Sequence, residues 1–363
     1  MLKEKKKISP LRLAGMIIAR LLLLILAIAA VLIAFLSITE YRPADRTSAT
    51  INGSADSGLA VGDSFTIMSW NIGYGALGDN ADFFMDGGKM VNTASKERVL
   101  SNMEGILAEI RTEEPDVIFL QETDINSSRS RRVNELESLK NSLKGYCSFF
   151  ANNFKVAFLP YPVPPMGKVD SGIATFSSYG VKSAERVQLP IPFSWPVRMA
   201  NLKRCLLISR VPIEGTDKEL VLINLHLEAY DDGEGKIAQT KMLAEILQEE
   251  AGKGNYVIAG GDFNQIFSSA DTGAYPAQPG KWAAGEIDVS QIPGDWQFIM
   301  DEAVPSCRSL DQPYAGADKD AFQYYLIDGF IVSGNVTVNS AENRDLGFVV
   351  SDHNPVVMNV TLG

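Results

Sequence analysis

Two histidines are the only imidazoles in this chain of 363 residues, and both stand in short polar motifs. His226 lies in Asn-Leu-His-Leu, and His353 lies in Ser-Asp-His-Asn-Pro. Imidazole titrates near neutral pH, so it can give or take a proton during a reaction. A lone histidine is more often a hydrogen-bonded core residue. The assignment of chemistry to these two therefore depends on the motifs that accompany them.

Three more polar motifs follow directly after apolar, strand-like runs. They are Trp70-Asn71, Gln121-Glu122, and the run Gly-Gly-Asp-Phe-Asn that contains Asp262 and Asn264. Strands that end at one edge of a sheet hold such side chains rigidly around a common space. Carboxylate and amide oxygens are ligands for hard divalent cations, and such ions assist the attack of water on an ester. The pattern predicts a metal-assisted hydrolytic site.

Taken in chain order, the motifs W-N, Q-E, N-x-H, G-D-x-N, I-D and S-D-H resemble those of the endonuclease/exonuclease/phosphatase superfamily, the DNase I-like phosphohydrolases. The resemblance covers roughly residues 64–362. It implies an α+β fold, a four-layer α/β/β/α sandwich of two mixed β-sheets with the site at one sheet edge. It also implies metal ligands at Asn71, Glu122 and Asp352, catalytic residues at His226, Asp262, Asn264, Asp328 and His353, and a phosphate contact by Arg204. The implied cofactor is Mg²⁺ or Mn²⁺, with Ca²⁺ as a further option.

Each of these side chains has a chemical role that suits its type. Glu122 is the principal metal ligand that the resemblance implies, while Asp262 can accept a proton from water and Asn264 can hold a phosphoryl oxygen. The resemblance also implies that Asp328 holds His353 and favours its charged form. The alternatives are plain structural roles, namely a surface position for Glu122 and an Asx-turn that closes the strand at Asp262.

The chain departs from several branches of the superfamily. A histidine at the position of His226 resembles the DNase and sphingomyelinase branches, and it distinguishes the chain from the abasic-site endonucleases, which lack a histidine there. Leu326 stands two residues before Asp328, where Arg is common, and the Trp-Cys-Asp-Arg segment of inositol-polyphosphate phosphatases is absent. The acidic partner of His226 stays open, with Asp170 as a weak candidate. Phosphodiester hydrolysis is therefore favoured; a phosphomonoesterase and a catalytically silent binding protein are the alternatives.

Two further features bear on the substrate. The cluster Arg129, Arg131 and Arg132 could hold a second phosphate or an anionic lipid head group, although a solvated helix start is the more common role. The loops 75–95 and 190–196 carry aromatic residues that could face a lipid surface, stack on a base, or simply pack. A nucleic acid, a phospholipid head group and a small phosphoester all stay open as substrates, and no protein partner is predicted.

The N-terminal segment predicts a membrane anchor. Residues 21–36 are all apolar and, extended to 13–38, are long enough to span a bilayer. The basic residues before them predict a cytoplasmic segment 1–12 and an extracytoplasmic catalytic domain, on a single-pass protein of the plasma membrane. A signal peptide cleaved near Ala27-Ile28-Ala29 is the alternative. The small, polar stretch 39–63 predicts a flexible linker, and residues 64–363 form one catalytic domain.

Charge and cysteine content narrow the partners further. Six basic and two acidic residues among the first 40 leave a net charge of −15 on the remainder of a chain whose total is −11. Such a domain repels polyanions at long range, which argues against tight non-specific binding of nucleic acid. The three cysteines, Cys147, Cys205 and Cys307, are too few for a disulfide framework and are predicted to be buried free thiols.

Periodicity places the secondary structure around these motifs. Apolar, β-branched runs predict strands at 65–72, 117–122, 148–159, 172–177, 204–213, 219–227, 255–261, 324–333 and 355–361. Apolar residues at helical spacing predict helices at 96–113, 131–143 and 236–250. Strands therefore end immediately before or within most of the polar motifs.

Overall fold

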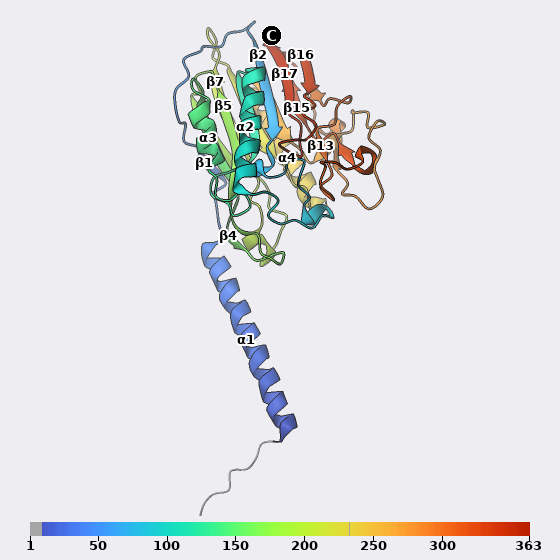
Figure 1. Cartoon of the computed structure of the whole chain (residues 1–363). Coiled ribbons are helices and arrows are strands. Elements are labelled where there is room, and N and C mark those ends of the chain that lie inside the picture. Colours follow the sequence, from blue (N-terminus) through green and yellow to red (C-terminus); the bar gives the residue numbers. More distant parts are fainter. Residues whose placement is uncertain (1–8, 232) are drawn as a thin grey trace, which may run out of the picture.

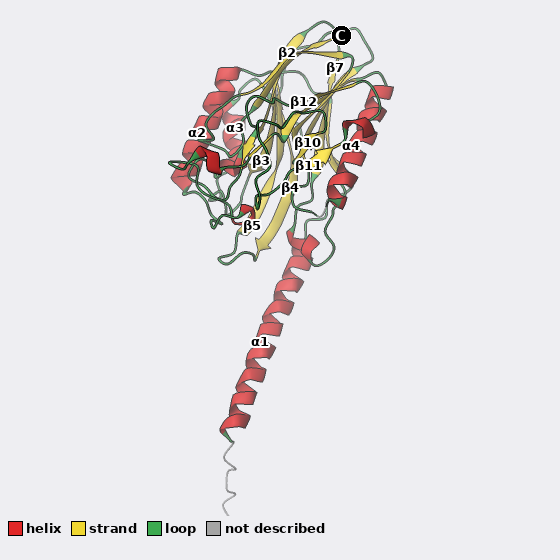
Figure 2. Cartoon of the chain, turned by 90° about the vertical axis from the view of Figure 1, so that its right-hand side faces the viewer, coloured by secondary structure: helices red, strands yellow, loops and turns green. Residues whose placement is uncertain are grey.

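The computed structural model describes residues 9–231 and 233–363. Two β-sheets are stacked face to face, and helices cover the outer face of each sheet (Figure 1, Figure 2). The predicted four-layer α+β sandwich is therefore confirmed. Most of the predicted cytoplasmic segment, residues 1–8, lies outside the described residues.

The two sheets differ in size but both are mixed. The larger has seven strands in the order β1 (Arg46–Ser48), β6 (Ser183–Gln188), β7 (Cys205–Pro212), β8 (Glu219–His226), β9 (Tyr256–Asp262), β15 (Asp328–Ser333) and β12 (Trp296–Ile299). The smaller has six in the order β16 (Val336–Asn343), β17 (Val356–Leu362), β2 (Ser64–Asn71), β3 (Val117–Asp124), β5 (Gly167–Ser177) and β4 (Cys147–Leu159). Two short pairs lie apart from them, β10 (Gln265–Phe267) with β11 (Gly285–Ile287) and β13 (Cys307–Arg308) with β14 (Tyr324–Tyr325).

Each sheet has one parallel pair, β2 with β3 and β8 with β9, and the neighbouring strands are antiparallel. A parallel pair needs a crossover connection, and helices supply it here. α2 (Lys96–Glu113) joins β2 to β3, and α4 (Glu234–Gly252) joins β8 to β9. Parallel strands end at the same edge, so each sheet brings two strand ends together.

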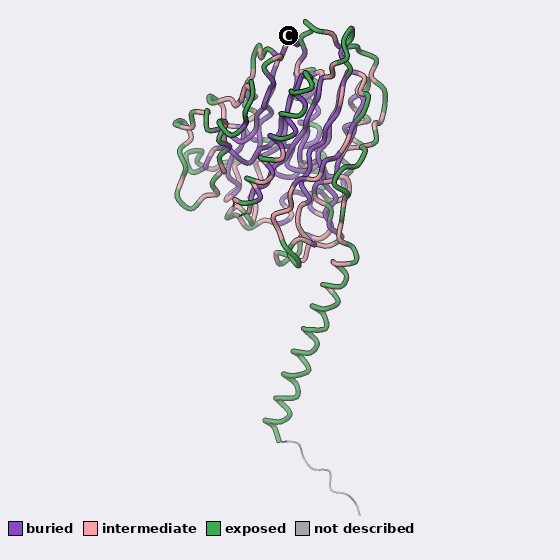
Figure 3. The backbone as a smooth tube through the Cα atoms, turned by 180° about the vertical axis from the view of Figure 1, so that it is seen from behind, coloured by how far each residue is buried: buried purple, intermediate pink, exposed green. Residues whose placement is uncertain are grey.

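Buried residues are concentrated inside the domain, along the strands and the layers between them (Figure 3). The core between the sheets is formed by alternate residues of the central strands, among them Phe119, Ile258 and Met358, each fully buried. The outer face of the smaller sheet packs against α2 and α3 (Glu135–Ser142), and that of the larger sheet packs against α4. Each strand of the centre is therefore covered on both faces, which explains its near-continuous apolar sequence.

The first helix, α1 (Pro10–Thr39), leaves the domain at one end (Figure 1). Its side chains are exposed along most of its length, and Leu36 is buried where it meets the domain. At a rise of 1.5 Å its 30 residues extend about 45 Å, against roughly 30 Å for the hydrocarbon core of a bilayer. The helix is thus long and apolar enough to cross a membrane.

The prediction of a flexible linker over 39–63 is wrong for much of that stretch. Arg46–Ser48 form β1 at the edge of the larger sheet, and the backbone of Asn52 pairs with Ser148. Ser57 and Ala60 make further bridges along the domain. The composition is polar because these residues lie on the surface, but their backbone groups still find partners on exposed strands.

The sequence located most central strands within two residues but missed peripheral ones. β6, β12 and β16 have no counterpart among the predicted strands, and the 324–333 run divides into β14 and β15. The predicted helix 131–143 begins at Glu135, because Arg131 and Arg132 have positive φ values. The three cysteines are free and buried, as predicted.

Candidate active site

Strand ends from both sheets meet around one cavity. Asn71, the last residue of β2, pairs with Gln121 in the second half of β3, while His226 and Asp262 are paired at the ends of β8 and β9. Asp328, at the start of antiparallel β15, pairs with Asp262. The cavity has a volume of about 680 Å³, and Asn71, Glu122, Arg204, His226, Asp262, Asn264, Asp352 and His353 all line it. The structure therefore brings together eight of the nine predicted site residues in its wall, with Asp328 directly behind.

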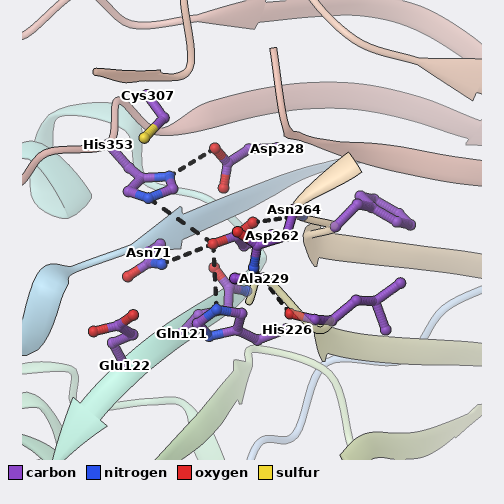
Figure 4. Close-up of polar contacts among 12 residues, drawn as sticks. Asn71, Gln121, Glu122, His226, Ala229, Asp262, Asn264, Cys307, Asp328 and His353 are labelled. Atoms are coloured by element: carbon purple, nitrogen blue, oxygen red, sulfur yellow. Dashed lines mark hydrogen bonds and ion pairs between the residues drawn. The ribbon is translucent and has the colours of Figure 1, made fainter. Parts of the chain in front are cut away.

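Asp262 lies at the centre of this group (Figure 4). Its Oδ2 accepts a hydrogen bond of 3.0 Å from Asn71 Nδ2, and so the two sheets are joined at the site. The same oxygen lies 3.4 Å from His226 Nε2 and 3.9 Å from His353 Nε2. One carboxylate thus faces both imidazoles of the chain.

The electrostatic environment of Asp262 makes it a base that works near neutral pH. Burial raises the pKa of this carboxyl to about 7, and repulsion from Asp328 adds to the effect. The charge of His353 and the hydrogen bond from Asn71 oppose it. A general base is most effective when its pKa is close to the working pH.

The two imidazoles differ in charge. Burial alone would lower the pKa of His353, but the Asp328 carboxylate raises it well above the ordinary value. His353 Nδ1 and Asp328 Oδ2 are 2.8 Å apart, as the resemblance implied. Burial and the Arg204 charge lower the pKa of His226 well below the ordinary value. These opposite shifts favour the charged form of His353 and the neutral form of His226 near neutral pH.

A β-bulge aims Glu122 into the cavity. The register between β3 and β5 shifts between Leu120 and Thr123, and Glu122 itself has a φ of 55°. Positive φ is uncommon outside glycine and is retained where a site requires it. The neighbouring Gln121 points between the sheets instead, where its amide donates to Asn224 Oδ1 over 2.9 Å.

Two carboxylates at the Asn71 side of the cavity have weak partners. Burial raises the pKa of both Glu122 and Asp352. Glu122 has Arg129 at 3.8 Å, and the contact of Ser351 Oγ with Asp352 Oδ1 is 3.4 Å. Asp352 is buried, and the Glu122 side chain is 23% exposed. Carboxylates withdrawn from water in this way are normally paired or bound to a metal. These two groups and the Asn71 amide form an oxygen set that fits a hard divalent cation.

Asn264 sits in the turn that follows β9. Its backbone N–H donates to Asp262 Oδ1 over 2.9 Å, which is the Asx-turn considered as an alternative. Its side chain donates to the Leu227 carbonyl, also at 2.9 Å. The φ of Asn264 is 52°, so the extended backbone of β9 does not continue through this residue. The turn nevertheless leaves Asn264 in the cavity wall.

Two of the three arginines in the cavity wall are paired with an acid, while the third, Arg308, donates to the backbone carbonyls of Ser309 and Gly78. Arg204 Nε donates to Glu228 over 3.2 Å, and Nη1 donates to the His226 carbonyl. Arg129 is buried, makes two bonds to Asp124 and stacks 3.7 Å above the Tyr74 ring. The solvated role favoured for the arginine cluster is therefore wrong for Arg129.

The acidic neighbour of His226 is Asp262. Asp170, the candidate from the sequence, lies instead near Asn152, Lys155 and Lys168. Sequence reasoning missed this pairing and the site position of Tyr74, which is fully buried beside Arg129. The available signal for Tyr74 was its place three residues after Asn71 in a glycine-flanked turn, Gly-Tyr-Gly.

Comparison with known proteins agrees with this architecture. The family model described as Endonuclease/Exonuclease/phosphatase family matches residues 68–353. The fold resembles the endonuclease/exonuclease/phosphatase from Beutenbergia cavernae DSM 12333 with a TM-score of 0.56 and 19% identity, covering 83% of this chain and 72% of that one. For the Bacteroides vulgatus endonuclease/exonuclease/phosphatase the values are 0.54 and 16%, over 83% and 100% of the two chains. For D. rerio TDP2, solved with a single strand DNA product, they are 0.51 and 16%, over 82% and 99%. No curated protein matches the chain in sequence.

Proposed function

Because the chain belongs to the endonuclease/exonuclease/phosphatase family, we propose that it hydrolyses phosphodiesters in a reaction that depends on a divalent metal ion. The observation that carries the proposal is the position of Asp262, whose one oxygen faces a neutral and a charged imidazole. This arrangement supplies a base and a cation within one cavity, which are the two groups that in-line attack of water on a phosphate ester needs.

Asn71, Glu122 and Asp352 would hold the metal ion, with Mg²⁺ or Mn²⁺ preferred and Ca²⁺ also suited to oxygen ligands. When bound, the ion would neutralise charge on the phosphoryl group. It would also offset the burial of the Glu122 and Asp352 carboxylates.

The side chains divide the remaining work. Asp262 accepts a proton from the attacking water, whose oxygen forms the new bond to phosphorus as the bond to one ester oxygen breaks. His353 stays protonated because Asp328 holds it, and its charge stabilises the phosphoryl oxygens. His226 and Asn264 fix the phosphate by hydrogen bonds. The departing alkoxide ends as an alcohol with the proton that the water lost.

Arg204 is proposed to position His226 in addition to its predicted contact with phosphate, because one of its nitrogens holds the His226 carbonyl. The ion pair with Glu228 partly neutralises the Arg204 guanidinium, so less of its positive charge is available to the phosphate. We also propose that α1 anchors the enzyme in the plasma membrane, with the catalytic domain on the extracytoplasmic side.

The test is hydrolysis of bis-p-nitrophenyl phosphate by the purified full-length chain in detergent. Mg²⁺ or Mn²⁺ should support turnover, EDTA should abolish it, and added metal should restore it. Glu122→Gln should raise the metal concentration needed for half-maximal activity by at least roughly 10–100-fold, since changes to residues that only orient a metal ligand already cost this much. Glu137→Gln, whose side chain is 55% exposed on α3, is the matched control.

Full activity after exhaustive chelation would contradict the metal-dependent mechanism. Faster hydrolysis of p-nitrophenyl phosphate than of the diester would instead favour a phosphomonoesterase. Absence of turnover on both compounds with each metal would favour a binding protein that keeps the fold.

A further inference from the structure

The cavity is not confined to the catalytic side chains. At its far end the lining includes Leu32, Ile33 and Leu36, which belong to the last turns of α1. The same wall also includes apolar side chains from three separate segments of the chain, among them Phe83, Phe84, Leu159, Phe193 and Val197. A continuous passage therefore connects the polar site with the helix that is long enough to span a membrane.

The sheet topology turns the site toward that helix. In β5, Ser171 pairs with Asp124 on one side and with Phe154 of β4 on the other, so Phe154 marks the level of the site. β4 then continues to Leu159, about 17 Å further at 3.3–3.4 Å per residue. Its last part packs against Leu36 of α1. The strand ends that carry the site thus point to the end of the domain from which α1 leaves (Figure 1).

Ion pairs fix the end of α1 to the domain. Glu40 follows the helix directly, and its side chain is only 2% exposed. It accepts a bond of 3.1 Å from Arg198 and lies 3.7 Å from Lys203, which is itself buried. Ser37 Oγ donates to Met199 Sδ one turn earlier. These contacts leave little freedom for the domain to turn its site away from α1.

The loops around this junction expose large apolar side chains. Val163 is 92% exposed, Tyr161 66%, Val197 57% and Trp195 56%. Tyr161 and Val163 lie in the loop between β4 and β5. Val197 begins the short helix Val197–Ala200, which contacts α1, and Trp195 lies just before it. Clustered apolar and aromatic side chains next to a spanning helix are typical of a surface that enters the membrane interface.

We infer that the substrate is a phospholipid of the membrane that α1 crosses. The lipid would pass between α1 and the loops, with its acyl chains against the apolar wall and its phosphodiester among Glu122, Asp262 and His353. This inference rests on the proposed phosphodiesterase function. Water would add to phosphorus and one P–O ester bond would break, so one phosphodiester and one water yield one phosphomonoester and one alcohol.

Charge favours a lipid over a polynucleotide. Strands of nucleic acid are held by free basic side chains along their backbone. Two of the arginines that line the cavity, Arg129 and Arg204, are already paired with Asp124 and Glu228. The third, Arg308, is buried and donates to the backbone carbonyls of Ser309 and Gly78. The apolar wall offers contacts to acyl chains, which burial from water makes favourable.

The experiment uses the full-length chain reconstituted in vesicles of phosphatidylcholine, phosphatidylethanolamine and phosphatidylglycerol, with Mg²⁺ or Mn²⁺. Mass spectrometry of the organic and aqueous phases measures lipid products, and the same preparation is assayed with bis-p-nitrophenyl phosphate and a single-stranded oligonucleotide. The wild-type chain should hydrolyse a vesicle lipid faster than the oligonucleotide.

Val197→Asp should reduce the ratio of lipid to soluble-diester hydrolysis on the order of tenfold, which corresponds to about 1.4 kcal/mol of lost interfacial binding. Val61→Asp is the matched control, because Val61 is 52% exposed and lies just before the first residue of β2, at the end of that strand opposite to Asn71. It should leave the ratio at the wild-type value. Val163→Asp tests the same surface if Val197→Asp does not fold.

The outcomes separate the two proposals. Hydrolysis of the soluble diester without any lipid product would overturn the lipid inference and leave the phosphodiesterase proposal intact. A faster reaction with the oligonucleotide than with every lipid would also overturn it, in favour of nucleic acid. An unchanged ratio in both surface variants would overturn the route along α1. Failure with all three substrates would refute the phosphodiesterase proposal itself.

Discussion

Replacement of Asp328 by Asn tests the charge that the site assigns to His353. Asp328 Oδ2 lies 2.8 Å from His353 Nδ1, and both side chains are buried. An amide has no charge and can donate its own N–H to Nδ1, which favours the neutral ring. Asp328→Asn should therefore lower the pKa of His353 while it preserves the shape of the residue.

The magnitude follows from the hydrogen bond that is lost. Hydrogen bonds to charged groups contribute roughly 1.5–3 kcal/mol. If the full amount is lost in the transition state, kcat falls roughly 10–100-fold, since about 1.36 kcal/mol corresponds to a factor of ten. KM for bis-p-nitrophenyl phosphate should change much less, because the interaction grows as negative charge develops on the phosphoryl oxygens.

The small number of histidines gives a direct readout. With ¹⁵N-labelled histidine, the chain yields ring signals from only His226 and His353. In the presence of a chelator, the His353 signals of the wild-type chain should indicate the protonated ring at neutral pH, and those of Asp328→Asn should titrate at lower pH. Asp217→Asn, at a side chain that is 85% exposed, is the control. A neutral His353 in the wild-type chain, or unchanged kcat in Asp328→Asn with correct folding, would refute the reasoning.

Three further results are expected. His226→Ala and His353→Ala should each lower kcat on the order of 10²-fold, and kinetics of the double variant should show a loss smaller than the product, because the groups act as a unit; near-normal turnover of a folded His353→Ala would exclude its catalytic role. Burial alone would raise the pKa of Glu250, but hydrogen bonds from Arg210 and its neighbours lower it to about 2, so this stabilisation is present above the unfolded pKa of about 4.3 and is lost as pH falls toward 2. Glu250→Gln should therefore cost about 2–3 kcal/mol of unfolding free energy at pH 7 in urea titrations, with a difference that narrows below pH 5; an equal difference at every pH would be inconsistent with the ion pair as its source. Protease added to intact cells should remove the domain after residue 41, whereas protection until lysis would place it in the cytoplasm.

The residues of the site were predictable because polar side chains follow apolar, strand-like runs in the sequence. Which of these side chains contact one another depends on how the two sheets stack. The ordered motifs, through the family resemblance that they carry, implied Asn71, Glu122 and both histidines as site residues. The apolar stripe predicted α2 with its observed bounds, Lys96–Glu113. The helix ends at its C-cap, Glu114, which has a positive φ and is followed by Pro115. Local patterns of this kind reflect short-range sterics and one buried face, which a sequence displays directly.

Features that depend on distant partners were not predictable. β16 is an edge strand whose residues are largely polar and partly exposed, so it lacks an alternating apolar pattern. β1 has three exposed residues, Arg-Thr-Ser, and exists because β6 offers free backbone groups. Arg129 is buried because Asp124 and the Tyr74 ring receive it, and neither contact is visible from the local composition.

The hydrogen bond between the Gln121 and Asn224 amides, which joins the two sheets, has a consequence for how the chain reaches one native state. Apolar side chains resist the separation of two stacked sheets. They only weakly resist the sliding of one sheet over the other, because the shifted interface still buries apolar surface. Gln121 of β3 and Asn224 of β8 are fully buried and joined at 2.9 Å, and the Asn224 amide also donates to the Ala174 carbonyl over 2.8 Å. A slip of one residue would strand these amides without partners, at a cost of about 1–3 kcal/mol for each unsatisfied group. The pair thus fixes the register of the two sheets, and so aligns the site residues of one sheet with those of the other.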